Sequence, residues 1–216
     1  MDEVTTGLRS KAGRPTRAQA EARHQALLEA ALDHFLAKGF EQATIEGIAQ
    51  DVGMTKRTVY ARFPDKVALF RAAVALAIER YIVPHEAIEA TDKGDLEATL
   101  VAIAWLRVEQ VLTASGLRLQ RIINSESYRF PEVFAPFYER ATAPTLRFLA
   151  GLLERETRAG RLAIAEPQRA ATVFMSMVVS APVRTIVLGS PPPRDEMADG
   201  IRFAVRLFLD GARPRL

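Results

Sequence analysis

A dense group of hydrogen-bond donors occupies one short segment of the chain. The donors are Lys56, Arg57, Thr58, Tyr60 and Arg62. Lysine and arginine pair with phosphate groups, and arginine can also donate two parallel hydrogen bonds to the edge of a guanine base. A short helix cannot bury so many polar groups without partners, so this segment must face water or an anionic molecule.

The residues on both sides of Gly53 predict two short amphipathic helices joined by a turn. Thr44 and Thr55 are good N-caps for the two helices. Their apolar positions, at helical spacing, are Ile45, Ile48, Ala49, Val52, Val59 and Phe63. This arrangement over residues 44–63 is typical of a helix-turn-helix whose second helix enters the major groove of DNA.

The distribution of charge indicates an anionic partner more strongly than the net charge of +3 does. Basic residues outnumber acidic residues by five to one over 9–23 and by four to one over 52–66. We expect residues 1–16 to form a flexible basic arm that reaches the minor groove, with Arg14 and Arg17 as its contacts. A disordered tail without a partner is the alternative.

Apolar residues recur at helical spacing along the rest of the chain, and no strand alternation is found. We therefore expect an all-α fold. Gly39 is a natural end for the first helix, and Pro144 should bend a long one. Beyond the two short helices, those expected cover residues 17–38, 65–83, 96–113, 115–128, 131–160, 167–188 and 195–209.

The helices over 170–188 and 195–209 are apolar almost all round, so each needs cover on both sides. A two-fold dimer in which these helices pack against their copies would supply that cover. The residues expected at this interface are Val173, Val179, Val183, Ile186, Ile201, Val205 and Phe208. Burial of both helices in the core of a monomer is the alternative.

No motif in the sequence points to catalysis. The chain has no cysteine, and its histidines, His24, His34 and His85, form no metal pair at one-turn spacing. The motifs GxSxG, GxGxxG and GxxxxGK[ST] are absent too. We expect no enzymatic activity, no metal and no cofactor.

The chain also lacks the marks of a membrane or exported protein. Its longest uncharged apolar run is too short to span a bilayer, and the N-terminus has no apolar core of the signal-peptide kind. The absence of cysteine fits a reducing compartment. We expect a cytoplasmic protein without a membrane partner.

A series of short motifs runs through the N-terminal third of the chain. They are Gly13-Arg14-Pro15, Gly39-Phe40, Ile48-Ala49, Gly53 to Lys56, and Tyr60, Phe63 and Lys66 at spacings of three. By these motifs the segment from Arg14 to Val74 resembles the tetracycline-repressor (TetR/AcrR) family of bacterial transcriptional regulators. Arg57 and the pair Ala61-Arg62 depart mildly from the family pattern, so the operator sequence does not carry over from a relative.

The resemblance implies an N-terminal three-helix helix-turn-helix domain and a larger C-terminal helical domain, in an Ω-shaped homodimer. The expected division is an arm at 1–16, a DNA-binding domain at 17–66 and a regulatory and dimerisation domain at 67–216. The predicted contacts to operator DNA are Arg14, Arg17, Thr44, Thr55, Lys56, Arg57, Thr58, Tyr60, Arg62 and Lys66. Among them we expect Arg57 to read a base, and Arg62 and Lys66 to anchor phosphates.

The C-terminal domain is expected to bind a small-molecule effector that releases a repressor from a palindromic operator. The candidate effector-binding residues are Trp105, Arg121, Asn124, Phe134, Phe137, Phe174, Met175 and Met177. Two alternatives stay open: a helical small-molecule-binding protein or enzyme, and an architectural DNA-binding protein without sequence preference. Footprinting on DNA separates the second alternative from a specific regulator.

Overall fold

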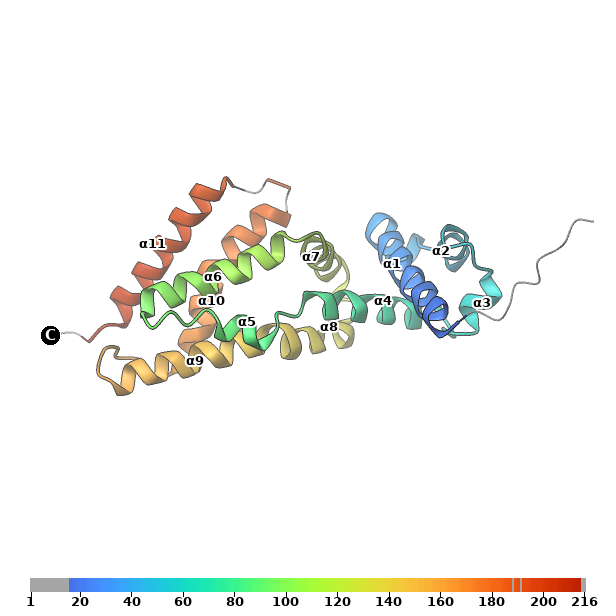
Figure 1. Ribbon diagram of the computed structural model, residues 1–216. Coiled ribbons are helices and arrows are strands. Elements are labelled where there is room, and N and C mark those ends of the chain that lie inside the picture. Colours follow the sequence, from blue (N-terminus) through green and yellow to red (C-terminus); the bar gives the residue numbers. More distant parts are fainter. Residues whose placement is uncertain (1–15, 188, 191, 215–216) are drawn as a thin grey trace, which may run out of the picture.

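The computed structural model describes residues 16–187, 189–190 and 192–214, except for the side chains of 181–182 and 186–187. Within these described residues the chain is helical and has no strand, which confirms the all-α prediction. The molecule is elongated, with the first three helices at one end and the C-terminal helices at the other (Figure 1). The fourth helix, which is long, lies between them.

The N-terminal end consists of α1 (Arg17–Gln42), α2 (Ile45–Asp51) and α3 (Lys56–Tyr60), and α4 (Lys66–Tyr81) follows. Gly39 interrupts α1 with a φ of 73°, and one short helical segment follows it. A positive φ at this position favours glycine, because a side chain there would crowd the backbone. The prediction that the first long helix ends at Gly39 is confirmed, although a last turn continues beyond it.

Side-chain caps fix where these helices begin. The Thr16 hydroxyl accepts a hydrogen bond from the Gln19 backbone, and the Gln19 side chain accepts one from the Thr16 backbone, which forms a capping box. The side chains of Thr44, Thr55 and Asp65 cap α2, α3 and α4, and each accepts a hydrogen bond from a backbone N–H in the first turn of its helix. Loss of such a cap costs about 0.5–2 kcal/mol.

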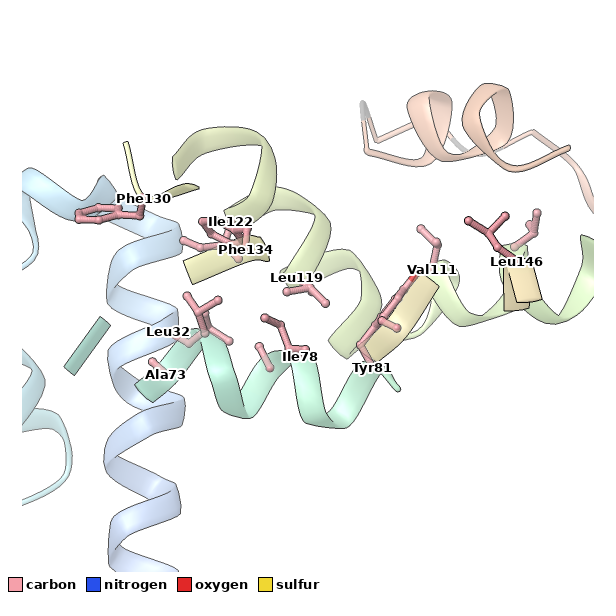
Figure 2. Packing of buried hydrophobic residues seen from close by; sticks show 14 of the residues in the cluster. Leu32, Ala73, Ile78, Tyr81, Val111, Leu119, Ile122, Phe130, Phe134 and Leu146 are labelled. Atoms are coloured by element: carbon pink, nitrogen blue, oxygen red, sulfur yellow. The ribbon is translucent and has the colours of Figure 1, made fainter. Parts of the chain in front are cut away.

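One hydrophobic core continues from α1 through α4 into the C-terminal helices. Phe40, Phe70 and Phe130 pack with ring centroids 4.7 to 5.3 Å apart. Figure 2 shows buried side chains along α4 from this aromatic group to Tyr81 at its end. Because close-packed interiors transmit displacement rather than absorb it, movement at the end of α4 is expected to reach α1.

The C-terminal part contains α5 (His85–Glu89), α6 (Leu96–Leu112), α7 (Ala114–Glu126), α8 (Pro131–Phe137), the π-helix η1 (Tyr138–Thr142), α9 (Ala143–Arg158), α10 (Pro167–Val187) and α11 (Arg194–Ala212). The sequence did not predict α5, which is too short to show a hydrophobic period. The other helical segments begin and end within a few residues of the prediction.

The helix predicted over 131–160 is present as an unbroken helical run from Pro131 to Arg158, but its middle is not an α-helix. The run is divided into α8, the π-helical segment η1 and α9. Pro136 and Pro144 each lack a backbone N–H, so each interrupts the ladder of helical hydrogen bonds. The backbone widens into the π-helix between the two prolines, a feature frequent at functional sites.

No single helix of the described residues is both long and apolar enough to cross a membrane. The helices α6 and α7 reach the required composition only as a pair, and they are bent by 79° relative to each other.

Candidate nucleic-acid interface and cavity

The turn between α2 and α3 depends on Gly53, which has a φ of 62°. On the inner side of the two helices, Ile48 and Val59 are fully buried. These buried residues hold α3 against α2 and turn its other face outward. The predicted helix-turn-helix over residues 44–63 is therefore present, with α3 as its second helix.

The donor-bearing side chains of this second helix are exposed. The guanidinium groups of Arg57 and Arg62 form no hydrogen bond or ion pair with any residue that the structure describes. Two guanidinium groups thus remain available to an anionic molecule beside α3. The exposed ring of Tyr60 lies on the same short segment.

Lys56, in contrast, has an intramolecular partner. Its ammonium group pairs with the Glu46 carboxylate of α2 and lies 5.6 Å from the centroid of the Tyr60 ring. The hydrogen bond between them lowers the pKa of Glu46 and raises the pKa of Lys56. Both groups are exposed, so the pair orients Lys56 along α2 more than it stabilises the fold.

The threonines at the starts of the two helices act as caps. Thr44 Oγ1 accepts a hydrogen bond from the Gly47 backbone at 3.2 Å, and Thr55 Oγ1 accepts one from the Thr58 backbone at 3.1 Å. The Thr55 and Thr58 hydroxyl oxygens are 2.8 Å apart. All three threonines are nevertheless exposed at the surface.

Lys66 has a structural role that the sequence did not predict. Its ammonium group donates hydrogen bonds to the backbone carbonyls of Glu41 at 3.0 Å and Ala43 at 3.2 Å. The same group lies 4.6 Å from the centroid of the Phe40 ring. Lys66 therefore ties the first turn of α4 to the C-terminal end of α1.

The arm residue Arg14 lies outside the described residues, and Arg17 is exposed in the first turn of α1. His24 stacks on Phe63 with ring centroids 5.9 Å apart. This contact holds the N-terminal half of α1 near the end of α3, as Figure 1 also shows. Arg17 thus lies at the same end of the molecule as the exposed arginines of the helix-turn-helix.

A cavity of about 310 Å³ lies where α4 meets the C-terminal helices. Tyr81, the last residue of α4, reaches it, and its ring centroid is 5.5 Å from that of Phe137. Figure 2 shows Tyr81 beside Val111 at this end of α4. The other lining residues are Arg107, Gln120, Tyr138, Thr142, Leu146, Thr172, Met175, Ser176, Val179, Ser180 and Val183.

Arg107 is the charged residue of this cavity, and the sequence analysis missed it. Its side chain belongs to α6, is 5% exposed, and has a buried Nη1 without a hydrogen-bond partner. Burial lowers the pKa of Arg107. Burial also raises the pKa of Tyr81, and this effect outweighs the charge of Arg107 and the hydrogen bond with Gln120, which both lower it. An arginine within the otherwise apolar run of α6 was the available signal.

The predicted effector-binding residues do not come together in this cavity. Only Phe137 and Met175 are among its lining residues. Trp105 lies under the Arg194 guanidinium, 4.7 Å from it, and Phe174 packs in the core against Phe208.

The remaining four predicted effector-binding residues lie elsewhere. Arg121 and Asn124 are exposed on α7, and Phe134 is part of the hydrophobic core. Met177 borders two grooves on the α10 and α11 side of the molecule.

The predicted dimer residues divide between three environments. Ile201 and Val205 are buried in the core, and Val179 and Val183 line the cavity. Val173 and Phe208 border a surface groove of about 610 Å³ between α10 and α11. The side chain of Ile186 lies outside the described residues.

Two further apolar residues stand out on this surface and were missed. Phe203 is 69% exposed and Leu207 is 55% exposed, although both are large and apolar. Together with Val173, at 49%, they form an apolar surface on α10 and α11. The sequence showed an apolar helix but did not separate its inner residues from its outer ones.

Direct contacts join α7 to the end of α1. The buried Glu126 carboxylate accepts a hydrogen bond from the Phe40 backbone at 3.2 Å. The Arg129 guanidinium lies 4.8 Å from the Phe40 ring centroid and pairs with Glu41. The helix-turn-helix end and the cavity end therefore meet through α7 as well as through α4.

Comparison with known proteins identifies both parts of the chain. Residues 27–73 match the family described as bacterial regulatory proteins, tetR family. Residues 98–211 match the C-terminal domain described as that of AefR-like transcriptional repressors.

Individual relatives give the same result. The solved structure of the flavonoid-responsive regulator FrrA is 30% identical, with a TM-score of 0.68, and the match covers 91% of this chain and all of that one (100%). The HTH-type transcriptional regulator RutR of Escherichia coli K12 is 26% identical, over 98% of this chain and 97% of RutR. The regulator SrpR of Pseudomonas putida is 30% identical, and the match covers 52% of this chain and 58% of SrpR.

Proposed function

Since the chain belongs to the TetR family of helix-turn-helix transcriptional regulators, we propose that it is a sequence-specific repressor that a small-molecule effector releases from DNA. The family is one of regulators and not of enzymes. The observation that carries the proposal is the exposed donor surface of α3, where Arg57 and Arg62 have no partner among the described residues. Buried Ile48 and Val59 hold that surface outward.

Each exposed donor has a proposed role in DNA binding. Arg57, in the first turn of α3, reads a guanine edge in the major groove, and Arg62 anchors a phosphate. The other proposed contacts to the DNA backbone are Arg14, Arg17, Thr44, Thr55, Lys56, Thr58 and Tyr60. For Lys56 this role competes with its ion pair to Glu46. Lys66, which the sequence analysis expected to anchor a phosphate, is left out, because its ammonium group is already bound to two backbone carbonyls.

The proposed active form is a homodimer that joins α10 and α11 to their copies. The exposed side chains of Val173, Phe203 and Leu207 support this interface, because a second copy would remove them from water. Two helix-turn-helix units related by a two-fold axis would meet half-sites about 34–36 Å apart, so the operator should be palindromic.

The cavity at the end of α4 is the proposed effector site. Tyr81 links it to α4, whose first turn contacts the end of α1 through Lys66. An effector that binds one arrangement of α4 more tightly than another would shift the spacing of the two DNA-reading units. Operator affinity would fall by at most the ratio of the effector's affinities for the two arrangements of α4.

Selection of genomic fragments by the purified protein tests the DNA-binding proposal. The expected result is enrichment of a palindrome, and tighter binding to that duplex than to its scrambled sequence in fluorescence anisotropy at several salt concentrations. Light scattering of the free protein should give a dimer mass. Equal affinity for both duplexes would reject the specific repressor and leave an architectural DNA-binding protein.

A further inference from the structure

Arg107 has no counter-charge within the part of the chain that the structure describes. Its side chain is 5% exposed, and it forms no ion pair or hydrogen bond with the residues that the structure describes. The nearest recorded partner is the face of the Tyr81 ring, whose centroid lies 5.6 Å from the guanidinium carbon. None of the described residues that line the cavity is acidic.

A buried arginine without a counter-charge lowers the stability of a fold. Removing a cation from water is costly, and the attraction of an aromatic face offsets only part of that cost. The cost disappears when an anion enters and pairs with the guanidinium group. An unpaired cation facing a cavity therefore indicates that its partner comes from outside the chain.

The other residues that line the cavity indicate what the rest of the ligand should be, beyond its anionic group. Val111, Leu146 and Met175 provide an apolar wall, which suits a hydrocarbon or aromatic body. Tyr81 and Gln120 line the same cavity and carry further hydrogen-bond donors. Its volume of about 310 Å³ is at the lower end of small-molecule sites, which run from about 300 to 1,000 Å³.

We propose that this cavity binds a small organic carboxylate with an apolar body, and that Arg107 is the residue that selects it. The carboxylate accepts two parallel hydrogen bonds from the guanidinium group, and the apolar body packs against the wall formed by α6, α9 and α10. The assignment of the bound acid as an effector rests on the proposed function, but binding of the acid does not.

Selectivity follows from the same geometry. A neutral amide of equal shape fills the apolar wall but leaves Arg107 without a counter-charge. A charge-assisted hydrogen bond contributes about 1.5–3 kcal/mol, so the acid should bind about 10- to 100-fold more tightly than its amide.

Titration calorimetry on the full chain tests the proposal with three acids of increasing size: benzoate, 2-naphthoate and biphenyl-4-carboxylate. Each is compared with its own amide. We expect at least one acid to bind the wild-type protein about 10-fold or more tightly than its amide. If no acid is preferred over its amide, including the case in which none binds, the proposal is overturned.

Two variants test whether Arg107 causes the preference for an acid over its amide. Arg107→Met keeps most of the side-chain volume and should abolish the preference, while Arg107→Lys keeps the charge without the planar fork and should reduce it. The matched control is Arg147→Met, which removes an exposed arginine of α9 that does not line the cavity. A preference that survives Arg107→Met in a folded protein overturns the assignment.

Operator binding is measured on the same samples, so the two proposals fail separately. Selective DNA binding without a preference for acids removes this inference and leaves the repressor. A preference for acids without selective DNA binding removes the repressor and leaves the carboxylate site.

Discussion

Lys66 and Arg62 both carry positive charge near the helix-turn-helix, but the structure distinguishes their roles. Lys66 donates to the backbone carbonyls of Glu41 and Ala43 and lies over the Phe40 ring, whereas Arg62 has no partner among the described residues. We therefore predict that Lys66→Met lowers the stability of the protein and that Arg62→Met does not.

The magnitude follows from the contacts that each substitution removes. A hydrogen bond from a charged donor is worth about 1.5–3 kcal/mol, towards the low end for a half-exposed lysine, and the ring contact adds about 0.5–1 kcal/mol. Lys66→Met should thus cost about 2–3 kcal/mol, which corresponds to a fall in Tm of about 4–12 °C for a chain of this length. Arg62→Met should stay within about 0.5 kcal/mol of the wild type.

Thermal and urea unfolding followed by circular dichroism measure the stability. Anisotropy titrations at several salt concentrations, at a temperature where both variants are folded, then measure DNA binding. Arg62→Met should weaken binding to every sequence about equally and reduce the salt slope by about one, and Lys66→Met should keep the wild-type slope. A wild-type Tm for Lys66→Met, together with a reduced salt slope, would refute the structural role and restore a phosphate contact.

Three further predictions concern the turn, the recognition surface and the dimer. Gly53→Ala should destabilise by about 1–2 kcal/mol because of its positive φ, whereas Gly151→Ala in α9 should stabilise by about 0.5–1 kcal/mol. An added Cβ meets nothing within 4 Å at either glycine, so equal shifts in Tm would exclude backbone strain as the cause. Arg57→Ala should cost about 1–3 kcal/mol of operator affinity and relax specificity in anisotropy titrations, and an identical loss on scrambled DNA would reject base reading. Joint substitution of Phe203 and Leu207 by Asp should give a monomer in light scattering, and a persistent dimer would place the interface elsewhere.

The local elements could be predicted because their signals are contiguous in the chain. Caps at Thr44, Thr55 and Asp65, and the glycines at positions 39 and 53, mark where helices begin and end. The helix expected over 131–160 is continuous in the structure, but its π-helical segment was not predicted: the sequence shows Pro136 and Pro144, but the response of the backbone to two prolines depends on what packs around them.

The candidate effector site could not be predicted from residue types alone. Phe174 and Trp105 have the chemistry of a binding pocket, yet Phe174 is fully buried in the core and Trp105 does not line the cavity. Arg107 interrupts an apolar run of α6, but a sequence does not reveal which face of that helix turns inward, so the place of Arg107 in the cavity could not be assigned. The same limit applies to Lys66, whose partners lie more than 20 residues away in the chain.

The sequence by itself determined that the chain is helical, that residues 44–63 form a helix-turn-helix, and which side chains of α3 are polar. Those features depend on interactions between residues a few positions apart, such as caps, helical spacing and a left-handed glycine. Only the tertiary structure decided that Arg107 lines a cavity and that Lys66 binds backbone carbonyls, and it showed no partner for the side chains of Arg107 and Arg57 among the residues it describes. These are properties of burial and of contacts between distant segments, which the chain acquires only when α4, α6 and α10 pack together.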